Sequence, residues 1–375
     1  MSRVLLASNT AWYLYNFRSG LIAALRDRGH EVIAAAPHDE YSARLAAAGG
    51  EVVDLPMDNK GTNPLRDLHT LLYFWRVLSN HRPDAALFFT IKPVIYGSLA
   101  SRLLAIPAIS TITGLGTAIL RNNWLTHVVE RLYRVSLRWP AKVFFQNEDD
   151  HKLFVERGLV CEKKAERVPG SGVDLRRFGV APPAANPAPV FLLSGRLLWD
   201  KGVGEFIEAA RRIKATHPGT AFQLLGPLGV ANSSSISKEQ VDAWVKEGVI
   251  SYLGETDDVV PYIAAADCVV LPSYREGTSR TLLEAAAMAR PIVTTDVPGC
   301  RQIVEDGVTG LLCRPKDSTD LKEKIERMIA LGPAQRSEMG RKGRQKMERE
   351  FDERIVIARY LSAIDRILSG RGKAW

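Results

Sequence analysis

The stretch DCVVLPSYREGTSRTLLEA, residues 267–285, joins the two features that decide the fold. Its first six residues form a run of the length of a buried strand, and an amphipathic helix is predicted to begin near Ser279. A buried strand that leads into a helix is typical of parallel sheets covered by helices on both faces. Glu276 lies on the intervening loop, and Glu284 on the second turn of the helix.

The same alternation extends in both directions along the chain. In the second half, strands are predicted at 190–194, 221–225 and 250–253, with helices at 203–216 and 238–246. In the first half, a helix is predicted at 18–28 and strands at 4–7, 31–36, 85–90, 108–111 and 142–146. The pattern therefore predicts an α/β protein, and 375 residues exceed the size of one ordinary core, so two domains are expected.

The domain boundary is expected where this alternation stops. PGSGVDLRRF (169–178) and APPAANPAP (181–189) are rich in turn residues and carry little core material. We therefore expect an N-terminal domain at 1–168, a linker at 169–189 and a C-terminal domain at 190–352.

The composition excludes several classes of protein. No run of about 18 uncharged apolar residues and no signal peptide is recognised, so a cytoplasmic location is expected. The four cysteines are far apart without CxxC spacing, and the adjacent aspartates do not form a DxD motif, so no metal is expected. The whole net charge of +8 falls within residues 60–142, where eleven Lys and Arg stand against three acidic residues. Such a block suits nucleic acid, anionic lipid or a phosphorylated ligand.

The loop around Glu276 has the chemistry of a nucleotide-sugar site. The backbone amides of Gly277, Thr278 and Ser279 lie at a helix N-terminus, where the helix dipole favours a diphosphate, and carboxylates accept hydrogen bonds from sugar hydroxyls. Taken alone, a pair of glutamates at this spacing is better explained by a solvated helix start capped by Ser279.

The loop after the predicted strand at 190–194 supplies two cations. Arg196 and Lys201 in SGRLLWDKG (194–202) are able to stabilise the negative charge of a departing diphosphate without a metal. The alternative is a pair of surface charges. The location of both motifs after strands of one sheet favours the functional interpretation.

Four motifs in this order resemble the retaining glycosyltransferases of family 4, which include phosphatidylinositol mannosyltransferases and sucrose synthases. PGSGVDLRRF is similar to the family's NGVD segment, GRLLWDKG to its GRL…KG loop and EGTSRTLLEA to its E(x7)E motif. VPGCRQIVEDGVTGLL (297–312) is similar to the family's GG…E.V.DG..G.L stretch. The resemblance implies the GT-B fold, with two Rossmann-like domains facing across a cleft and a C-terminal helix, about 353–375, crossing back to the N-terminal domain.

The resemblance also implies roles for single residues. Arg196 and Lys201 would hold the diphosphate, Glu284 the ribose, and Glu276 the donor sugar, with Arg196, Lys201 and Glu276 as the catalytic set. The remaining donor-binding residues that it implies are Gly195, Gly226, Tyr252, Leu253, Gly277, Thr278, Ser279 and Leu283. No cofactor is implied, because the nucleotide-sugar itself carries the reactive group.

The acceptor side departs from the family pattern. The loop after the first strand reads SNTAWYLYNFR (8–18) instead of a glycine-rich turn, and Thr113 in TITGLGT (111–117) stands where many members have a histidine. Thr113, Gly114 and Arg18 are the acceptor-side candidates, Arg18 for an acceptor diphosphate. A plain charge at the start of a helix is the alternative for Arg18.

Two amphipathic segments carry the basic excess. In residues 123–139, a helical wheel places apolar residues on one side, among them Trp124 and Trp139, and Arg131, Arg134 and Arg138 on the other. Core packing and membrane docking both explain such a helix, and the two tryptophans among arginines favour the membrane interface. Residues 66–82 form a second basic amphipathic segment, with the apolar residues Leu71, Leu72, Phe74, Trp75 and Leu78.

Within the family, the strongest likeness is to bacterial enzymes that extend undecaprenyl-diphosphate-linked sugars, including N-acetylgalactosaminyltransferases. It implies a nucleotide-sugar donor, a lipid-linked saccharide acceptor and a peripheral position on the anionic inner face of the cytoplasmic membrane. A transferase with a soluble or phosphatidylinositol-type acceptor and a UDP-sugar epimerase of the same fold are the alternatives. Nucleic acid is not expected as a partner, because the basic residues alternate with apolar helix positions and no recognition motif is present.

Overall fold

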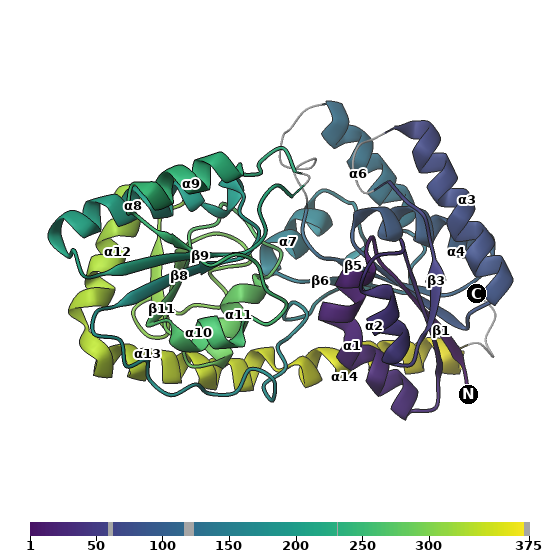
Figure 1. Ribbon diagram of the computed structural model, residues 1–375. Coiled ribbons are helices and arrows are strands. Elements are labelled where there is room, and N and C mark those ends of the chain that lie inside the picture. Colours follow the sequence, from purple (N-terminus) through teal and green to yellow (C-terminus); the bar gives the residue numbers. More distant parts are fainter. Residues whose placement is uncertain (59–62, 116–123, 231, 371–375) are drawn as a thin grey trace. The chain divides into compact units, whose positions relative to one another are not determined.

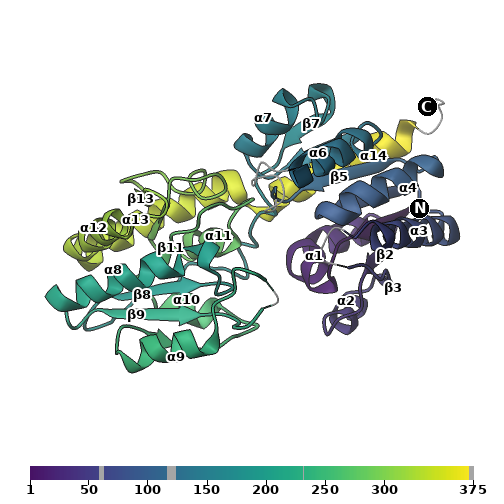
Figure 2. The same cartoon turned by 90° about the horizontal axis from the view of Figure 1, so that it is seen from above.

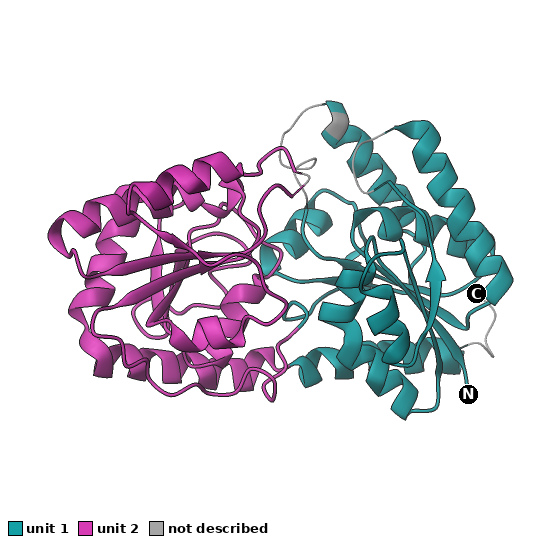
Figure 3. Cartoon of the chain, viewed as in Figure 1, with its two compact units in different colours: residues 1–171, 353–375 teal, residues 172–352 magenta. Residues whose placement is uncertain are grey.

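The computed structural model describes residues 1–58, 63–115, 124–230 and 232–370 (Figure 1). The chain forms two compact units, Met1–Ser171 with Glu353–Trp375 and Gly172–Asp352 (Figure 3). Each unit has its own parallel sheet and its own hydrophobic core. Two Rossmann-like domains were predicted, and this prediction is confirmed.

The sheet of unit 1 has seven parallel strands in the order β3-β2-β1-β4-β5-β6-β7. The strands are β1 (Arg3–Ala7), β2 (Glu31–Ala36), β3 (Glu51–Asp54), β4 (Ala85–Phe89), β5 (Ala108–Ile112), β6 (Lys142–Phe145) and β7 (Ala165–Arg167). Strand β1 lies inside the sheet and pairs with β2 and β4, with Leu5 opposite both Ile33 and Ala86. The direction of strand addition reverses between β1 and β4, which makes their carboxyl ends the switch point of this sheet.

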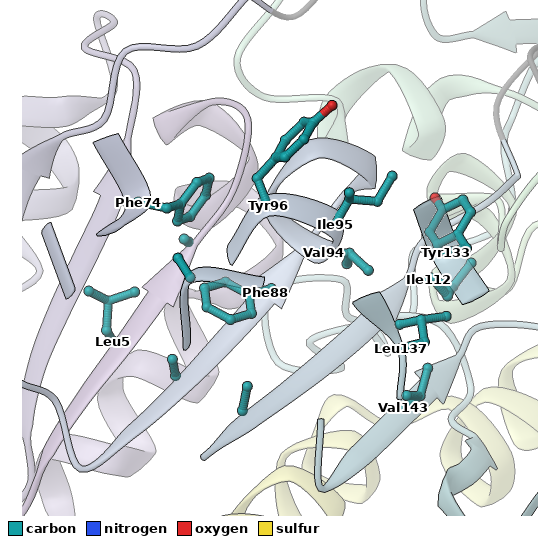
Figure 4. Close-up of a cluster of buried hydrophobic side chains, with 14 of the residues drawn as sticks. Leu5, Phe74, Phe88, Val94, Ile95, Tyr96, Ile112, Tyr133, Leu137 and Val143 are labelled. Atoms are coloured by element: carbon teal, nitrogen blue, oxygen red, sulfur yellow. The ribbon is translucent and has the colours of Figure 1, made fainter. Parts of the chain in front are cut away.

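Helices cover both faces of this sheet. One layer contains α3 (Pro64–His81), η1 (Pro93–Gly97), α4 (Ser98–Leu103), α6 (Trp124–Ser136) and α7 (Glu148–Glu156), and the other contains α1 (Ala11–Asp27), α2 (Ser42–Ala47) and α14 (Glu353–Gly370). A short η2 (Glu162–Lys164) precedes β7. Figure 4 shows the first layer, where Phe74 of α3, Val94 of η1 and Tyr133 of α6 meet Phe88 of β4 and Val143 of β6.

Helix α1 begins seven residues earlier than predicted. The expectation of a helix at 18–28 was wrong at its start, because Thr10 caps the helix and accepts a hydrogen bond from the Tyr13 amide at 3.1 Å. Threonine is a favoured N-cap residue, so this signal was present in the sequence. The aromatic residues between Ala11 and Phe17 hid the helical period. Of residues 11–17, only Ala11 and Leu14 are fully buried.

Unit 2 repeats the architecture with six parallel strands in the order β10-β9-β8-β11-β12-β13. The strands are β8 (Val190–Ser194), β9 (Ala221–Leu225), β10 (Ser251–Tyr252), β11 (Cys268–Leu271), β12 (Ile292–Thr295) and β13 (Gly310–Cys313). The helical elements are η3 (Trp199–Lys201), α8 (Val203–Thr216), α9 (Lys238–Lys246), α10 (Val260–Ala265), α11 (Arg280–Ala287), α12 (Ser318–Ala330), α13 (Gly332–Lys346) and η4 (Met347–Phe351). Strand order reverses between β8 and β11, the two strands that precede the predicted motifs.

The segment 169–189, expected to be a linker, contributes to the core of unit 2 from Gly172 onward. Val173 and Phe178 are buried among the side chains of α11 and β11. The Val173 amide donates to the carbonyl of Phe351 at 2.9 Å, and Arg344 donates to the carbonyl of Phe178 at 2.8 Å. The passage from unit 1 to unit 2 falls within this segment, between Ser171 and Gly172, and its few apolar residues belong to the core of unit 2.

Helix α14 returns the chain to unit 1. Val356, Tyr360 and Ile364 are buried in the layer that also contains α1. The Tyr360 ring packs against Phe144 of β6, and its hydroxyl is 2.8 Å from that of Thr111 on β5. The predicted C-terminal helix at about 353–375 is thus part of the N-terminal unit as far as residue 370.

Candidate functional site

The candidate site lies at the switch point of unit 2. In open parallel sheets, ligands bind beyond the carboxyl ends of the strands where the strand order reverses, here β8 and β11. The loop 195–202 follows β8, and the loop 272–279 follows β11 and leads into α11. Both predicted donor motifs are therefore carried on adjacent strands.

A glycine allows these two loops to touch. Gly202 has a φ of +72°, and a β-carbon there would lie 2.1 Å from the carbonyl oxygen of Pro272. No other residue type fits so close to the backbone, which explains why glycine follows Lys201. The Tyr274 amide donates to the carbonyl of Asp200 at 2.9 Å and fixes the loops further.

This contact brings Lys201 and Glu276 together. The Lys201 ammonium forms an ion pair with Oε1 of Glu276, and the same oxygen accepts a hydrogen bond from Ser273 Oγ at 2.8 Å. The two side chains are only 18% and 13% exposed, so water screens their attraction less than at the surface. A ligand that carries both phosphates and hydroxyls is able to replace each partner of this pair.

Ser279 supports the loop instead of offering its amide to a ligand. Its amide donates to the carbonyl of Gly299 at 3.0 Å, and its hydroxyl accepts from the Leu282 amide at 3.4 Å. Ser279 is 3% exposed and caps α11, as the alternative interpretation expected. The positive end of the α11 dipole still points toward the loop of Gly277 and Thr278.

The glycines at the ends of β8 and β9 also meet. A β-carbon on Gly226 would lie 1.9 Å from the carbonyl oxygen of Gly195, so both backbones are in direct contact. The Gly226 amide donates to the carbonyl of Gly254 at 2.8 Å, and the Tyr252 hydroxyl donates to the carbonyl of Gly226 at 2.9 Å. Three of the predicted donor-binding residues, Gly195, Gly226 and Tyr252, thus form one surface.

The two predicted leucines are placed differently. Leu253 follows β10, is half-buried, and its amide donates to the carbonyl of Leu224 at 2.8 Å. Leu283 is 1% exposed and packs in the core beneath α11. Its side chain supports the helix from below and does not reach the surface of the site.

Glu284 lies on the second turn of α11, as predicted, but with a partner that the sequence analysis missed. Arg280 Nε donates to Glu284 Oε1 at 2.8 Å, and the two side chains are 20% and 13% exposed. Arginine at the first position of a helix opposes the helix dipole, and this signal was available in the sequence.

Arg196 is not held by other groups. It is exposed, and its guanidinium makes no hydrogen bond or ion pair with any residue that the structure describes. It shares the loop after β8 with Lys201, which is paired. Of the two residues predicted to bind the diphosphate, Lys201 is therefore held in an ion pair and Arg196 is not.

The acceptor-side candidates belong to unit 1. Thr113 and Gly114 follow β5 and are half-buried, and residues 116–117 of the same motif lie outside the described residues. Arg18 lies in the middle of α1 and is 2% exposed, so its interpretation as a charge at a helix start was wrong. Its guanidinium carbon is 4.3 Å from the centre of the Phe89 ring, and Nη2 donates to the Tyr13 hydroxyl at 2.9 Å.

Helix α6 presents its tryptophan side to the surface. Its core contacts come from Thr126, Val129 and Tyr133, whereas Trp124 is 73% exposed. The apolar residues of this segment are therefore divided between the core and the surface, and Trp124, which was predicted to face the membrane, is at the surface. The exposed apolar residues of this segment are Trp124, Val128, Val135 and Trp139.

The basic residues of the same segment are exposed as well. Arg131, Arg134 and Arg138 lie beside the exposed apolar residues. Arg134 donates to the carbonyl of Arg157 at 3.2 Å, and the ring of Trp139 lies under the guanidinium of Arg102 at 4.4 Å. The surface is therefore basic and apolar at once.

Helix α3 extends this surface. Both α3 and α6 pack against η1, and Figure 2 shows them on the same side of unit 1. The exposed apolar residues of α3 are Leu65, Leu68, Leu72, Tyr73 and Trp75. We call the exposed residues of α3 together with Trp124, Val128, Arg131, Val135, Arg138 and Trp139 the α3–α6 surface.

None of the helices described here combines the length and apolar character needed to cross a membrane. Across the same residues, no group of three or more His, Cys, Asp or Glu side chains is arranged to hold a metal ion.

Family models match both halves of the chain. Residues 188–330 match the model for glycosyl transferases group 1, and residues 17–171 match the model for a glycosyl transferase 4-like domain. The first match contains Arg196, Lys201, Glu276 and Glu284. The predicted family resemblance is thereby confirmed.

Individual proteins are similar to two thirds or more of the chain. The N,N'-diacetylbacillosaminyl-diphospho-undecaprenol alpha-1,3-N-acetylgalactosaminyltransferase of Campylobacter jejuni is 29% identical over 98% of this chain and 99% of its own. The UDP-Gal:alpha-D-GlcNAc-diphosphoundecaprenol alpha-1,3-galactosyltransferase of Escherichia coli is 24% identical over 68% of each chain. Among solved structures, Anabaena HepE in complex with UDP-glucose matches with a TM-score of 0.79 at 18% identity, over 97% of this chain and 100% of that one.

Proposed function

Because this chain belongs to the group 1 glycosyl transferases, we propose that it transfers a hexose or N-acetylhexosamine from a UDP-sugar to a saccharide linked to a polyprenyl diphosphate, with retention at the anomeric carbon. The observation that carries the proposal is the half-buried pair of Lys201 and Glu276 at the switch point of unit 2. In this proposal, Lys201 is the cation for the leaving diphosphate and Glu276 the carboxylate for the sugar hydroxyls.

Each charged residue of the site has a role in this proposal. Lys201 and the exposed Arg196 bind the diphosphate and stabilise the negative charge that grows on it as the sugar leaves. Glu276 accepts hydrogen bonds from the donor sugar, and Glu284 accepts them from the ribose. Gly195, Gly226 and Tyr252 line the adjacent surface for the nucleoside.

The proposed reaction breaks the bond between the anomeric carbon and the donor phosphate oxygen. The acceptor hydroxyl attacks from the same face, through a transition state with oxocarbenium character like that of glycoside hydrolysis. The departing phosphate takes the proton of the acceptor hydroxyl, so the products are the new glycoside and UDP. The protein contributes orientation and electrostatic stabilisation.

The acceptor is assigned from the relatives and from the charge of unit 1. The Campylobacter and Escherichia proteins carry diphospho-undecaprenol acceptors in their names. Thr113 and Gly114 lie at the end of β5, near the switch point of unit 1. Arg18 of α1 is buried against Tyr13, Phe89 and Tyr360. No acidic side chain contacts it among the described residues, so its charge adds a positive potential that favours an acceptor diphosphate.

The same proposal assigns the α3–α6 surface to the inner face of the cytoplasmic membrane. Exposed tryptophans and leucines favour the interface between headgroups and acyl chains, and exposed arginines favour anionic lipids. A polyprenyl acceptor is itself embedded in that membrane. Peripheral binding would therefore bring the enzyme to its substrate.

A donor screen tests the function. The purified protein is incubated with a polyprenyl-diphosphate-linked saccharide in the presence of chelator and, in turn, UDP-hexoses, UDP-N-acetylhexosamines and GDP-mannose. We expect UDP release that depends on the lipid acceptor, with a product one sugar longer. Transfer from GDP-mannose alone would contradict the assignment of the base.

The screen also separates the alternatives. A UDP-sugar epimerase would convert the donor without lengthening any acceptor. A transferase for soluble acceptors would release UDP equally well when the lipid-linked saccharide is replaced by the free saccharide. Either result would overturn the proposed acceptor.

A further inference from the structure

Arg280 is in a place that helix stability does not explain. It is the first residue of α11, where the helix dipole favours an anion, and it precedes its partner Glu284 by four positions. A cation placed N-terminal to an acid at this spacing is the weaker order for such a pair. Both charges therefore oppose the helix dipole, and another requirement must hold them there.

The arginine is held by more than its carboxylate. Nη1 donates to the carbonyl of Gly172 at 3.2 Å, and the guanidinium carbon is 5.7 Å from the centre of the Phe178 ring. Arg280 and Glu284 are 20% and 13% exposed. The guanidinium is thus fixed on three sides, and it fixes Oε1 of Glu284 in turn.

We propose that Arg280 is a positioning residue that orients the carboxylate of Glu284 toward the ribose of the donor. With Oε1 held by Arg280, Oε2 is the oxygen presented to the ribose hydroxyls. The inference rests on the proposed function, since it takes Glu284 as the ribose ligand. It adds that ribose recognition depends on Arg280, which contacts the carboxylate and not the sugar.

The experiment compares the binding of UDP with that of 2′,3′-dideoxy-UDP, which lacks both ribose hydroxyls, by isothermal titration calorimetry. Hydrogen bonds to a charged group are worth about 10- to 100-fold in affinity, so wild-type protein is expected to prefer UDP by about that factor. Arg280→Met is expected to weaken UDP binding by about tenfold or more and to leave dideoxy-UDP binding within about threefold. Arg280→Lys keeps the charge without the planar fork and is expected to lie between the two.

Lys322→Met is the matched control. Lys322 also precedes its partner, Glu326, by four positions, at 2.7 Å and with similarly low exposure, but on α12. It is expected to bind both ligands as the wild type does. Glu284→Ala is expected to abolish the preference for UDP, and Arg280→Met in that background is expected to add nothing.

The outcomes distinguish a failure of this inference from a failure of the proposed function. Equal loss of UDP and dideoxy-UDP binding in Arg280→Met would show that the arginine acts on the diphosphate or on folding, and it would overturn this inference alone. An unchanged preference in Arg280→Met and Arg280→Lys would do the same. If wild-type protein bound neither ligand, the proposed function would fail along with the inference.

Discussion

Removing the two cations of the loop after β8 should separate catalysis from stability. Arg196 is exposed and forms no hydrogen bond or ion pair with a described residue, whereas Lys201 is paired with Glu276 at low exposure. Arg196→Ala is therefore expected to lower kcat while leaving Tm unchanged. Lys201→Ala is expected to lower both, because Glu276 loses its counter-charge.

The magnitudes follow from burial. Loss of one group that stabilises transition-state charge costs about 10²–10³ in kcat, or about 2.7–4 kcal/mol. A fully buried ion pair costs about 3–5 kcal/mol when one partner is removed and a surface pair about 0–1 kcal/mol. The Lys201–Glu276 pair, at 18% and 13% exposure, lies between these limits, and we expect about 2 kcal/mol. For a domain of this size, that lowers Tm by about 4–8 °C.

The assay measures UDP release at saturating donor and thermal unfolding on the same preparations. Lys322→Ala is the control. It removes the ion pair of Lys322 with Glu326 on α12, whose side chains are 21% and 28% exposed and belong to neither loop of the site. It is expected to change Tm slightly and kcat not at all. If Arg196→Ala and Lys201→Ala both kept kcat within about threefold of the wild type, the electrostatic mechanism would be refuted.

Three further predictions concern the packing of the site, the membrane and pH. Gly202→Ala places a β-carbon 2.1 Å from a carbonyl oxygen, so Tm and kcat are both expected to fall, and unchanged values in melting and turnover assays would contradict the loop contact. Trp124→Glu changes a side chain that is 73% exposed, so it is expected to reduce flotation with anionic vesicles at least about fivefold at constant Tm, and equal flotation would argue against membrane docking. Burial raises the pKa of Glu166, but hydrogen bonds from Lys142 and Arg359 outweigh it and hold the pKa below its ordinary value. This stabilisation is present above pH about 4.3 and is lost as pH falls through the lower folded-state pKa, so the Tm deficit of Glu166→Gln at pH 7 should vanish in acid, and a deficit independent of pH would contradict the assignment.

Most of the fold was predictable because the strands are short apolar runs at regular intervals. The strands at 190–194 and 221–225 and the helices at 203–216 and 238–246 agree with the structure to the residue. A buried parallel strand has no polar face, so its apolar run ends where the strand ends. The start of α1 was not predicted, because aromatic residues on several sides of its first turns hide the helical period.

The site was predictable in its residues but not in their partners. The E(x7)E spacing placed Glu276 on a loop and Glu284 on the second turn of α11, and both positions are confirmed. The pairing of Glu276 with Lys201 depends on a contact between residues 75 positions apart, which no local pattern encodes. The pairing of Arg280 with Glu284 was missed because a single arginine at a helix start adds nothing to the apolar period from which the helix was predicted.

Which apolar residues of α6 meet the core was predictable only in part. A helical wheel finds the side on which apolar residues gather, but not whether that side meets the core or the solvent. In the structure, Tyr133 is fully buried, whereas Trp124, which was predicted to face the membrane, is exposed. Where a helix has apolar residues on two sides, the neighbouring elements decide which side packs into the core.

The return of α14 to unit 1 has a consequence for synthesis on the ribosome. Tyr360 and Ile364 fill a core layer whose other members, such as Leu14 and Phe144, are translated more than two hundred residues earlier. Unit 2 has every residue of its sheet and helices before α14 emerges, so it is able to fold first. Until α14 emerges, the part of unit 1 that is already synthesised exposes the apolar surface that α14 covers. We expect a nascent chain halted before residue 353 to need a chaperone that prevents aggregation through this surface.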